Sequence, residues 1–211
     1  MAMSLRRILK YTCAAVSLSW LGSQGLLVYH LKYAQKTDPL SKSSSDAIPL
    51  TVREDRKSIV DAVVGLYGLA YANQKMMQYA ENAVFEDPFA RLEGKQAIAS
   101  AFKIMADWFN KSENLEINVV HGKHLITIDQ LQRYTLPFLN TSFDIGSVIY
   151  LHLEDNDAGE ERIVHHIEEW SGKALLGKDA PYLGNIGYVA GQFRKAHGWP
   201  LKYIFKAPIE N

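Results

Sequence analysis

One strand-like segment, residues 162–170, carries the side chains best suited to proton transfer. Because alternate side chains of a strand point to opposite faces, the segment presents two sets of residues. These sets are Val164, His166, Glu168 and Trp170, and Ile163, His165, Ile167 and Glu169. If the first set faces the interior, His166 and Glu168 form an acid/base pair with perturbed pKa values. The alternative is an ordinary strand with one apolar core face and one solvated polar face.

A further acidic residue, Asp87, precedes Pro88 at the end of a predicted short strand, Ala83–Asp87. An aspartate in this position caps the turn that follows, and the proline fixes the geometry of that turn. From the residues alone, the first interpretation of Asp87 is therefore structural.

Five aromatic residues are placed either to line a cavity for a small apolar ligand or to pack as ordinary core. They are Tyr67, Tyr71, Phe102, Trp108 and Tyr134. The adjacent residues His165 and His166 point to opposite faces of a strand and cannot both bind one ion, so we expect no metal site. The sequence contains no Gly-rich phosphate loop, serine nucleophile elbow or thiolate motif, so we expect no cofactor.

The composition argues against several classes of protein. The 211-residue chain has 23 Lys and Arg and 23 Asp and Glu, hence no net charge, and no dense basic stripe follows its first ten residues. Nucleic acid is therefore not an expected partner, because its phosphate backbone is bound through such stripes. Cys13 is the only cysteine, so no intramolecular disulfide can form.

Residues 1–36 have the features of an anchor or a targeting segment. Residues 11–31 contain no charged side chain apart from His30, and a helix of this length, at about 1.5 Å per residue, just crosses a hydrocarbon core. We therefore expect membrane association through a single N-terminal anchor. The absence of acidic residues before Asp38 also fits mitochondrial targeting, and a cleaved signal or a soluble packing helix are further alternatives. Residues 37–50, rich in Ser, Pro and Asp, are expected to be a linker.

Beyond the linker, the hydrophobic pattern predicts one α+β domain over residues 51–172. Three helices are expected first: one from a capping box at Thr51 to Ala70, a short one from Asn73 to Ala80, and one after Gly94. Strands are then expected at 115–121, 125–137, 143–154 and 162–170. Helices followed by such strands specify an α+β layer architecture in which the helices pack on one face of a curved, mostly antiparallel sheet.

Residues 173–211 are predicted to be a C-terminal extension. A helical pattern that starts at Ile186 is expected to end near Gly198. The aromatic residues and lysines around its end fit either a membrane interface or a lid over the interior of the curved sheet. Sequons at Asn110 and Asn140 would accept glycans only if the domain faces a secretory lumen.

Two motifs resemble the nuclear-transport-factor-2-like superfamily, which includes the SnoaL-like proteins. The first motif is QYAENAVFEDP at residues 78–88, followed by GKQAI at residues 94–98. The second motif is RIVHHIEEW at residues 162–170, which is similar to the closing strand of SnoaL-like members. The resemblance covers roughly residues 55–172 and implies the cone-shaped α+β fold.

The resemblance also implies roles for individual residues. Ketosteroid isomerases of this superfamily use the aspartate of the Asp-Pro pair as general base, which corresponds to Asp87. SnoaL-like cyclases use an acidic residue on the closing strand, which corresponds to Glu168. The oxyanion-hole donors of the isomerases fall on Val63 and approximately Ile149, so steroid isomerisation by that mechanism is not expected. Tyr67, one helical turn after Val63, is the only nearby substitute.

Two functions stay open at this point. In the first, the domain binds a small apolar molecule in its cone and isomerises, cyclises or dehydrates it without a cofactor, using Asp87, His166 and Glu168. In the second, it is a non-catalytic, membrane-tethered binding or assembly module whose sheet pairs with a second copy, as a homodimer, or with another partner. The superfamily contains both kinds of protein, so the fold by itself does not choose between them.

Overall fold

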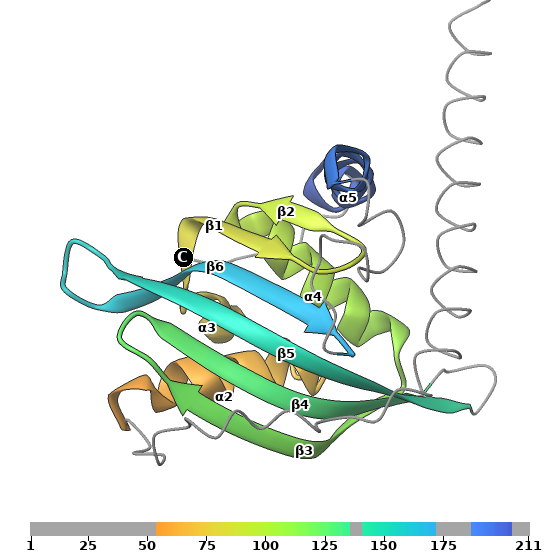
Figure 1. Ribbon diagram of the computed structural model, residues 1–211, viewed down its shortest axis with the longest axis horizontal. Coiled ribbons are helices and arrows are strands. Elements are labelled where there is room, and N and C mark those ends of the chain that lie inside the picture. The colour runs from red at the N-terminus through yellow and green to blue at the C-terminus, as the bar shows by residue number, and fades with distance from the viewer. Residues whose placement is uncertain (1–53, 136–140, 172–186, 204–211) are drawn as a thin grey trace, which may run out of the picture. The chain divides into compact units, whose positions relative to one another are not determined.

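Six strands form one curved sheet with three helices behind it in the computed structural model (Figure 1). The structure describes residues 54–135, 141–171 and 187–203. The chain divides into two units, residues 1–36 and 37–211, and all described residues belong to the second unit. In chain order the elements are the 3-10 turn η1 (Glu54–Arg56), α2 (Lys57–Tyr67), α3 (Asn73–Met76), β1 (Tyr79–Glu86), β2 (Arg91–Glu93), α4 (Lys95–Trp108), β3 (Lys111–His121), β4 (Leu125–Thr135), β5 (Ser142–Asp155), β6 (Glu161–Trp170) and α5 (Gly187–Tyr203).

The strand order is β2-β1-β6-β5-β4-β3, and every neighbouring pair is antiparallel except β1 and β6. The parallel pairing of β1 with β6 brings together the two sequence motifs, which are far apart in the chain. This architecture confirms the predicted fold class, with helices on one face of a curved, mostly antiparallel sheet. The short strand β2 was not predicted, because three residues are too few to show a period of two.

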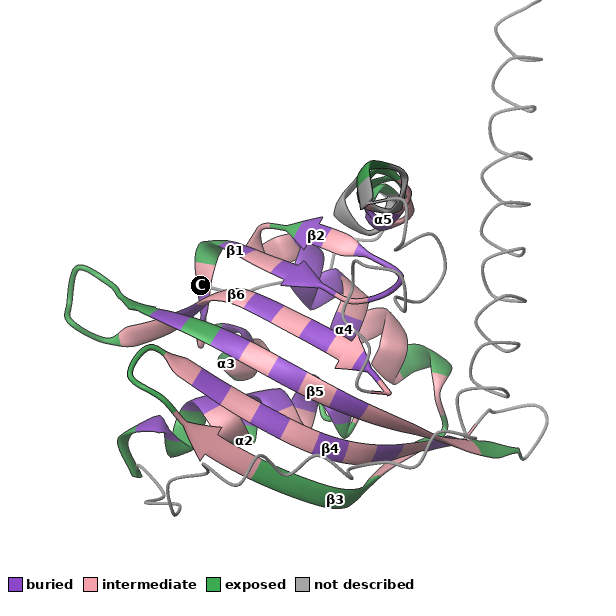
Figure 2. Ribbon diagram, in the orientation of Figure 1, coloured by how far each residue is buried: buried purple, intermediate pink, exposed green. Residues whose placement is uncertain are grey.

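The core lies between the sheet and the helices, where the buried residues are concentrated (Figure 2). Helix α2 buries Ile59, Val63 and Leu66, which recur at helical spacing. In β4 the side chains alternate between buried and half-buried along its whole length. This alternation means that one face of β4 is the inner face, directed at the helices, while the other is free of them.

The first two helices are shorter than the sequence predicts. Helix α2 ends at Tyr67, because Leu69 adopts a φ of 63°, which does not continue a right-handed helix. Ala70, which was expected in the last turn of this helix, lies beyond the helix and is exposed. Helix α3 ends at Met76, and Ala80 belongs to strand β1 instead. These expectations were wrong because helical spacing alone does not indicate where the backbone turns into a strand.

Helix α5 runs through Gly198 and ends at Tyr203, so the predicted end near Gly198 is wrong. The helix packs against β2 and α4. A Cβ atom at position 198 would lie 2.6 Å from the carbonyl oxygen of Arg91 and 2.7 Å from a methyl carbon of Leu92. Gly198 therefore permits a close approach between helix and strand and does not act as a helix stop.

Several sequence predictions concern residues outside the described ranges. These are the anchor at residues 11–31, the linker at 37–50, the capping box at Thr51 and the sequon at Asn140. Among the described helices, none combines the length and apolar character needed to cross a bilayer.

Candidate functional site

Strand β6 directs a mixed set of side chains into the interior. The buried residues are Ile163, His166, Glu168 and Trp170. The pairing of β6 with β5 has an irregularity that leaves Val164 without a counterpart. Such a bulge shifts the alternation by one residue. His166, Glu168 and Trp170 therefore meet the condition, stated above, that their set faces the interior, whereas Val164 does not and Ile163 takes its place.

Inward-facing residues of β4, β5 and β6 lie in rows across the sheet, because directly paired residues share a face. The first two rows place His166 and Glu168 beside aliphatic side chains, and the third row is polar. The rows are Ile126, Leu151 and His166; Ile128, Ile149 and Glu168; and Gln130, Ser147 and Trp170. Glu168 therefore lies where the apolar part of the interior meets its polar part.

Glu168 is a buried carboxyl with a specific hydrogen-bond donor. The hydroxyl of Tyr67, from α2, donates to Glu168 Oε2 at 2.8 Å. Burial, and then the charge of Asp87, raise the pKa of Glu168 to about 7, while Tyr67 and other nearby donors favour the ionised form and act in the opposite direction. At neutral pH this carboxyl can therefore both accept and donate a proton.

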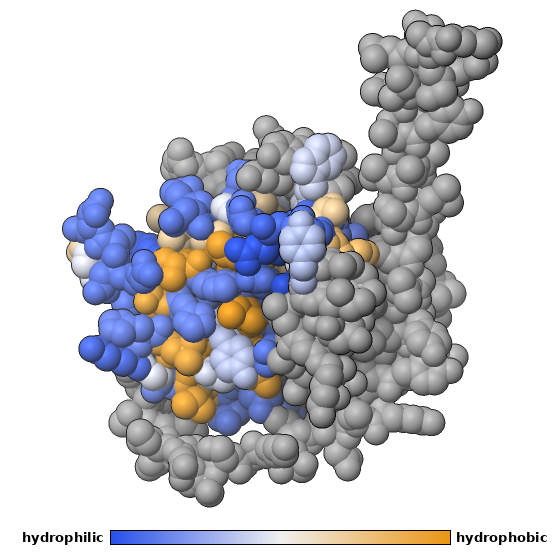
Figure 3. Space-filling model, turned by 45° about the horizontal axis from the view of Figure 1, so that its top comes forward, coloured by the Kyte–Doolittle hydropathy of each residue, from blue (hydrophilic) through white to orange (hydrophobic). Residues whose placement is uncertain are grey.

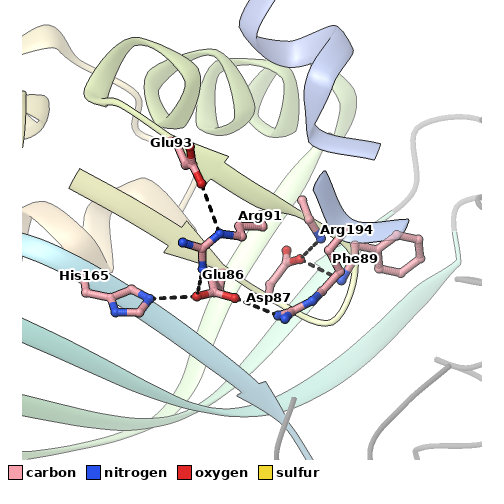
Figure 4. A network of polar contacts seen from close by, with 8 residues as sticks. Glu86, Asp87, Phe89, Arg91, Glu93, His165 and Arg194 are labelled. Carbon is pink, nitrogen blue, oxygen red and sulfur yellow. Dashed lines mark hydrogen bonds and ion pairs between the residues drawn. The ribbon is translucent and has the colours of Figure 1, made fainter. Parts of the chain in front are cut away.

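Asp87 has the structural role that its sequence context predicts. Its Oδ1 accepts the backbone N–H groups of Phe89 at 2.7 Å and Ala90 at 2.5 Å, which closes the turn between β1 and β2 (Figure 4). Burial nevertheless raises the pKa of Asp87 to about 6, although the two amides and Arg194 favour its charged form. The residue as a whole is half-buried.

The two carboxyls are coupled through their charges. The negative charge of Asp87 adds to the effect of burial in raising the pKa of Glu168, and the charge of Glu86 acts in the same direction on the pKa of Asp87. Between their two pKa values the pair holds a single proton. The arrangement supplies one carboxylate and one carboxylic acid under the same conditions, as acid/base chemistry requires.

His166 is fully buried and is held between two tyrosines. Its Nδ1 lies 2.8 Å from the hydroxyl of Tyr79, and its Nε2 lies 3.2 Å from the hydroxyl of Tyr67. Burial lowers the pKa of His166 to about 3, and His165 acts in the same direction. The imidazole is therefore neutral at physiological pH. The expected pair of His166 and Glu168 is bridged by the Tyr67 hydroxyl, which contacts both side chains.

Three of the five predicted aromatic residues lie in this interior. Tyr67 packs edge-on against Phe102 with ring centroids 5.4 Å apart, and Tyr134 is also buried. Tyr71 lies in the connection after α2, where its hydroxyl donates to Asn73. Trp108, at the end of α4, is 37% exposed. The structure places these last two side chains away from Glu168, since helix α2 ends early and α4 turns its last residue toward solvent.

Strand β4 contributes two buried amides that sequence reasoning missed. Gln130 Nε2 donates to Ser147 at 3.3 Å, and Gln132 Nε2 donates to Ser112 at 2.5 Å. Within the described part of the chain, the side-chain oxygens of both glutamines are buried without a hydrogen-bond donor. The signal that could have found them is the alternation of β4, which places both on the inner face with Ile126 and Ile128.

A separate ion network lies on the other side of the β1–β6 pair (Figure 4). Glu86 accepts His165 Nε2 at 3.0 Å and forms ion pairs with Arg91 and Arg194. Arg194 comes from α5 and is 5% exposed, so this network ties α5 to the sheet. His165 thus faces away from His166, as the strand alternation predicts.

The buried polar cluster of Tyr67, Tyr79, His166 and Glu168 is neither a metal site nor part of a surface groove that the structure shows. Across residues 54–135, 141–171 and 187–203, no group of three or more His, Cys, Asp and Glu side chains could hold a metal ion. A groove of about 180 Å³ lies between β2, α4 and α5, and it is lined by Arg91, Leu92, Glu93, Ala97, Lys195, Gly198 and Trp199. None of its lining residues belongs to the cluster around Glu168, so the groove and the cluster are separate sites.

Comparison with solved structures returns proteins of one structural superfamily. A protein from Catenulispora acidiphila with a ketosteroid isomerase-like fold, in complex with trimethylamine, is 14% identical, with 59% of this chain and 94% of that chain covered and a TM-score of 0.46. A protein from Shewanella putrefaciens described as a SnoaL-like polyketide cyclase is 13% identical, with 57% and 82% covered and a TM-score of 0.48. An NTF2-like protein from Anabaena variabilis is 12% identical, with 58% and 95% covered and a TM-score of 0.45.

These descriptions name the superfamily that the two sequence motifs resemble. No protein-family model and no curated protein matches the chain. Likeness at these identities and TM-scores assigns no activity, and the fold class stands on the architecture itself.

Proposed function

We propose that this domain binds a small, mainly apolar molecule beside Glu168 and moves a proton on it without a cofactor. The observation that supports the proposal is the buried carboxyl of Glu168, held at 2.8 Å by the Tyr67 hydroxyl, with its pKa raised to about 7 by burial and by the charge of Asp87. Paired carboxyls with separated pKa values are a recurring arrangement for acid/base catalysis.

Glu168 is the proton acceptor in the proposed reaction. Its carboxylate takes a proton from a ligand carbon, the C–H bond breaks, and the electron pair stays on the ligand as an enolate-type anion. Return of the proton from Glu168 to another carbon of the ligand completes an isomerisation. In a cyclisation the carbanion attacks a carbonyl carbon of the same ligand, and the resulting alkoxide takes the proton from Glu168. In a dehydration the C–O bond to a neighbouring hydroxyl breaks, and the hydroxide leaves as water with the proton from Glu168. The negative charge of Asp87 raises the basicity of Glu168, and the Tyr67 hydroxyl fixes the orientation of its carboxylate.

The residues around Glu168 suit a ligand that is apolar with a few hydrogen-bond donors. Aliphatic side chains of Ile128 and Ile149 flank Glu168 in the same row, and Phe102 packs on Tyr67. The buried side-chain oxygens of Gln130 and Gln132 would each accept a hydrogen bond from a hydroxyl or N–H group of such a ligand.

Hydrogen–deuterium exchange at carbon tests the proposal without requiring knowledge of the complete reaction. The protein is incubated in D₂O near pH 7 with a panel of enolisable cyclic ketones, and proton NMR follows the loss of each α-hydrogen signal. We expect exchange for at least one compound, and a decrease of about 10²- to 10⁴-fold in Glu168→Gln. Glu169→Gln, on the opposite face of β6, is the matched control and should keep the wild-type rate.

The proposal fails if no compound binds or exchanges, or if Glu168→Gln exchanges as fast as the wild type. Loss of exchange in both Glu168→Gln and Glu169→Gln would also contradict it, because the effect would then not be specific to the inner face.

A second candidate function is binding through the face of the sheet that carries no helix. The strand register places Leu131, Val148, Tyr150 and Ile167 on this face, all half-buried. Hydrophobic residues gather among hydrophilic ones on the molecular face seen in Figure 3. Sedimentation velocity of the wild type and Val148→Lys tests this function: a homodimer dissociated by the lysine supports it, and a wild-type monomer at all concentrations excludes self-pairing.

For the location of the protein we propose membrane association through residues 11–31, with mitochondrial targeting as the alternative. The support is the length of this uncharged run in the sequence. Cell fractionation with carbonate extraction distinguishes the two: an anchored chain stays with the membranes, whereas a processed mitochondrial chain is shortened and extracted.

A further inference from the structure

Four buried polar groups form a continuous hydrogen-bonded chain that begins on β1 and ends at Glu168. Tyr79 Oη lies 2.8 Å from His166 Nδ1, His166 Nε2 lies 3.2 Å from Tyr67 Oη, and Tyr67 Oη lies 2.8 Å from Glu168 Oε2. Tyr79 and His166 are 1% and 0% exposed. In such an enclosed chain the hydrogen bonds polarise one another, so a change at one end affects the other.

The number of available protons fixes the direction of the chain when Glu168 is ionised. A carboxylate only accepts, so the single hydroxyl proton of Tyr67 is directed at Glu168. The contact between Tyr67 and His166 must then use a proton on His166 Nε2. A neutral imidazole carries one N–H, so its Nδ1 is bare and accepts the hydroxyl proton of Tyr79. All three hydrogen bonds thus point toward the carboxylate.

We propose that Tyr79 is a positioning residue that acts on Glu168 through two other side chains. By donating to His166 Nδ1 it holds the imidazole in the Nε2–H tautomer, and this tautomer turns the Tyr67 hydroxyl toward the Glu168 carboxylate. The same role is played in other sites by groups that fix which nitrogen of a histidine carries the proton. The inference deepens the proposed function, because it rests on Glu168 as the proton acceptor, yet it concerns the protein without a ligand.

The chain reverses when a proton binds to Glu168 Oε2. The acid then donates to Tyr67, Tyr67 donates to His166 Nε2, and the imidazole carries its proton on Nδ1. This Nδ1–H donates to the oxygen of Tyr79, whose own hydroxyl proton turns away from the chain. The tautomer of His166 therefore reports the protonation of Glu168. The groups that face this carboxyl from each packed element are Tyr67 of α2, Asp87 at the end of β1, Tyr134 of β4, Ser147 of β5 and Trp170 of β6, with Arg194 of α5 acting on Asp87.

The first test is a measurement on the unaltered full-length chain labelled with ¹⁵N-histidine. Long-range ¹H–¹⁵N spectra give the protonation of each ring nitrogen, and loss of one signal set in His166→Gln assigns His166. Above pH 8 we expect a protonated Nε2 and a bare Nδ1. An Nδ1–H tautomer or an imidazolium ion at that pH overturns the proposal.

The second test removes the hydroxyl of Tyr79 with Tyr79→Phe, which preserves the ring. We expect a mixture of the two tautomers at His166. We also expect the titration midpoint of Glu168 to be about one pH unit higher, because its carboxylate loses part of the hydrogen bond from Tyr67. The ¹³C signals of labelled glutamate carboxyl groups measure this midpoint. Tyr71→Phe, which removes a hydroxyl bound to Asn73, is the control and should leave both readouts unchanged.

Unchanged tautomer and midpoint in Tyr79→Phe overturn the proposal, and the wild-type measurement decides it if this variant does not fold. Failure of the exchange experiment with an Nε2–H tautomer present would contradict only the proposed function. A wrong tautomer with active exchange would contradict only the role of Tyr79.

Discussion

The proton affinities of Asp87 and Glu168 arise mainly from removing two carboxyls from water. Each charged form loses hydration, and the hydrogen bonds that each carboxyl accepts restore only part of it. His166 responds in the opposite direction, because its charged form is the protonated one. Burial thus makes the acids weaker and the imidazole less basic in the same interior.

The pH dependence of stability tests the burial of Glu168. Its ordinary pKa is 4.5 and its folded pKa is about 7. Between these values the folded state holds a proton that the unfolded state has lost, so the free energy of unfolding falls as pH rises, by about 3 kcal/mol in total, and this contribution is constant above pH 7. In Glu168→Gln this fall should be absent, as measured by urea unfolding at pH 5 and pH 8.

The comparison must be made against the wild type, because other groups titrate in the same range. Asp87 contributes with the same sign, while His166, with a lowered pKa, contributes stability that increases as pH rises from about 3 toward 6.5. Glu169→Gln should follow the wild-type profile. Parallel profiles for the wild type and Glu168→Gln would show that Glu168 is not enclosed in the folded protein.

Two substitutions separate the structural role of Asp87 from its charge. Asp87→Asn keeps an oxygen that can accept the amides of Phe89 and Ala90, so we expect a stability close to wild type but a lower titration midpoint of Glu168. Asp87→Ala removes the acceptor and should cost about 1–2 kcal/mol. Thermal unfolding and carboxyl NMR provide the two readouts. Equal destabilisation by both substitutions would contradict the turn-closing role.

One buried side chain, Arg56, joins η1 to the sheet at the start of β6 and at the β3–β4 turn. Arg56 is fully buried; its Nε donates to Glu161 at 2.6 Å, and its Nη atoms donate to the carbonyl oxygens of Gly122 and Lys123 at 2.7 and 2.6 Å. A second hydrogen bond from Arg56 to Glu161 completes a two-point ion pair. The guanidinium thus connects η1, the β3–β4 turn and the start of β6.

Removing the guanidinium should be strongly destabilising. Arg56→Ala removes the ion pair with Glu161 and the hydrogen bonds to the carbonyl oxygens of Gly122 and Lys123, and we expect a loss of about 3–5 kcal/mol in the free energy of unfolding. Lys57→Ala is the control, because Lys57 forms only a solvent-exposed ion pair with Asp61, and we expect little change in stability. Chemical denaturation measures both, and a change below 1 kcal/mol for Arg56→Ala would refute this interpretation.

Two glycines of α5 provide a matched test of its packing. A Cβ atom at Gly198 collides with β2, whereas one at Gly191 meets nothing within 4 Å. We expect Gly198→Ala to lower the thermal midpoint and Gly191→Ala to raise stability by about 0.5–1 kcal/mol through helix propensity. If both substitutions stabilise the protein, α5 does not pack closely on β2.

For the whole molecule, the boundary between the anchor and the domain has a direct test. Deletion of residues 1–49 should leave a soluble protein with one cooperative thermal transition, because the predicted linker carries little apolar surface to bury. Membrane association should disappear with the deleted segment. Aggregation of the shortened chain, with a transition retained by the full chain in detergent, would mean that the N-terminal segment is a core helix and that the predicted boundary is wrong.

The sequence by itself determined the class of fold, the strand face that carries Glu168 and the turn that contains Asp87. Periods of 3.6 and 2 record which face of an element is buried, so the helices and the long strands were predicted close to their observed positions. The alternation on β6 correctly placed His166 and Glu168 on one face. The Asp-Pro pair correctly indicated a turn closed by Asp87.

Only the tertiary structure decided which side chains meet and how deeply they are buried. Tyr67 and Glu168 are 101 residues apart in the chain, and Arg56 and Glu161 are 105 apart, so no local pattern relates them. The bulge at Val164 depends on the pairing with β5. The half-buried position of Tyr71 and the exposure of Trp108 depend on where two helices end. A pKa depends on the surroundings of a group in three dimensions. The shifted pKa values of Asp87, His166 and Glu168 therefore could not be predicted from the sequence, because they depend on how the strands and helices pack together.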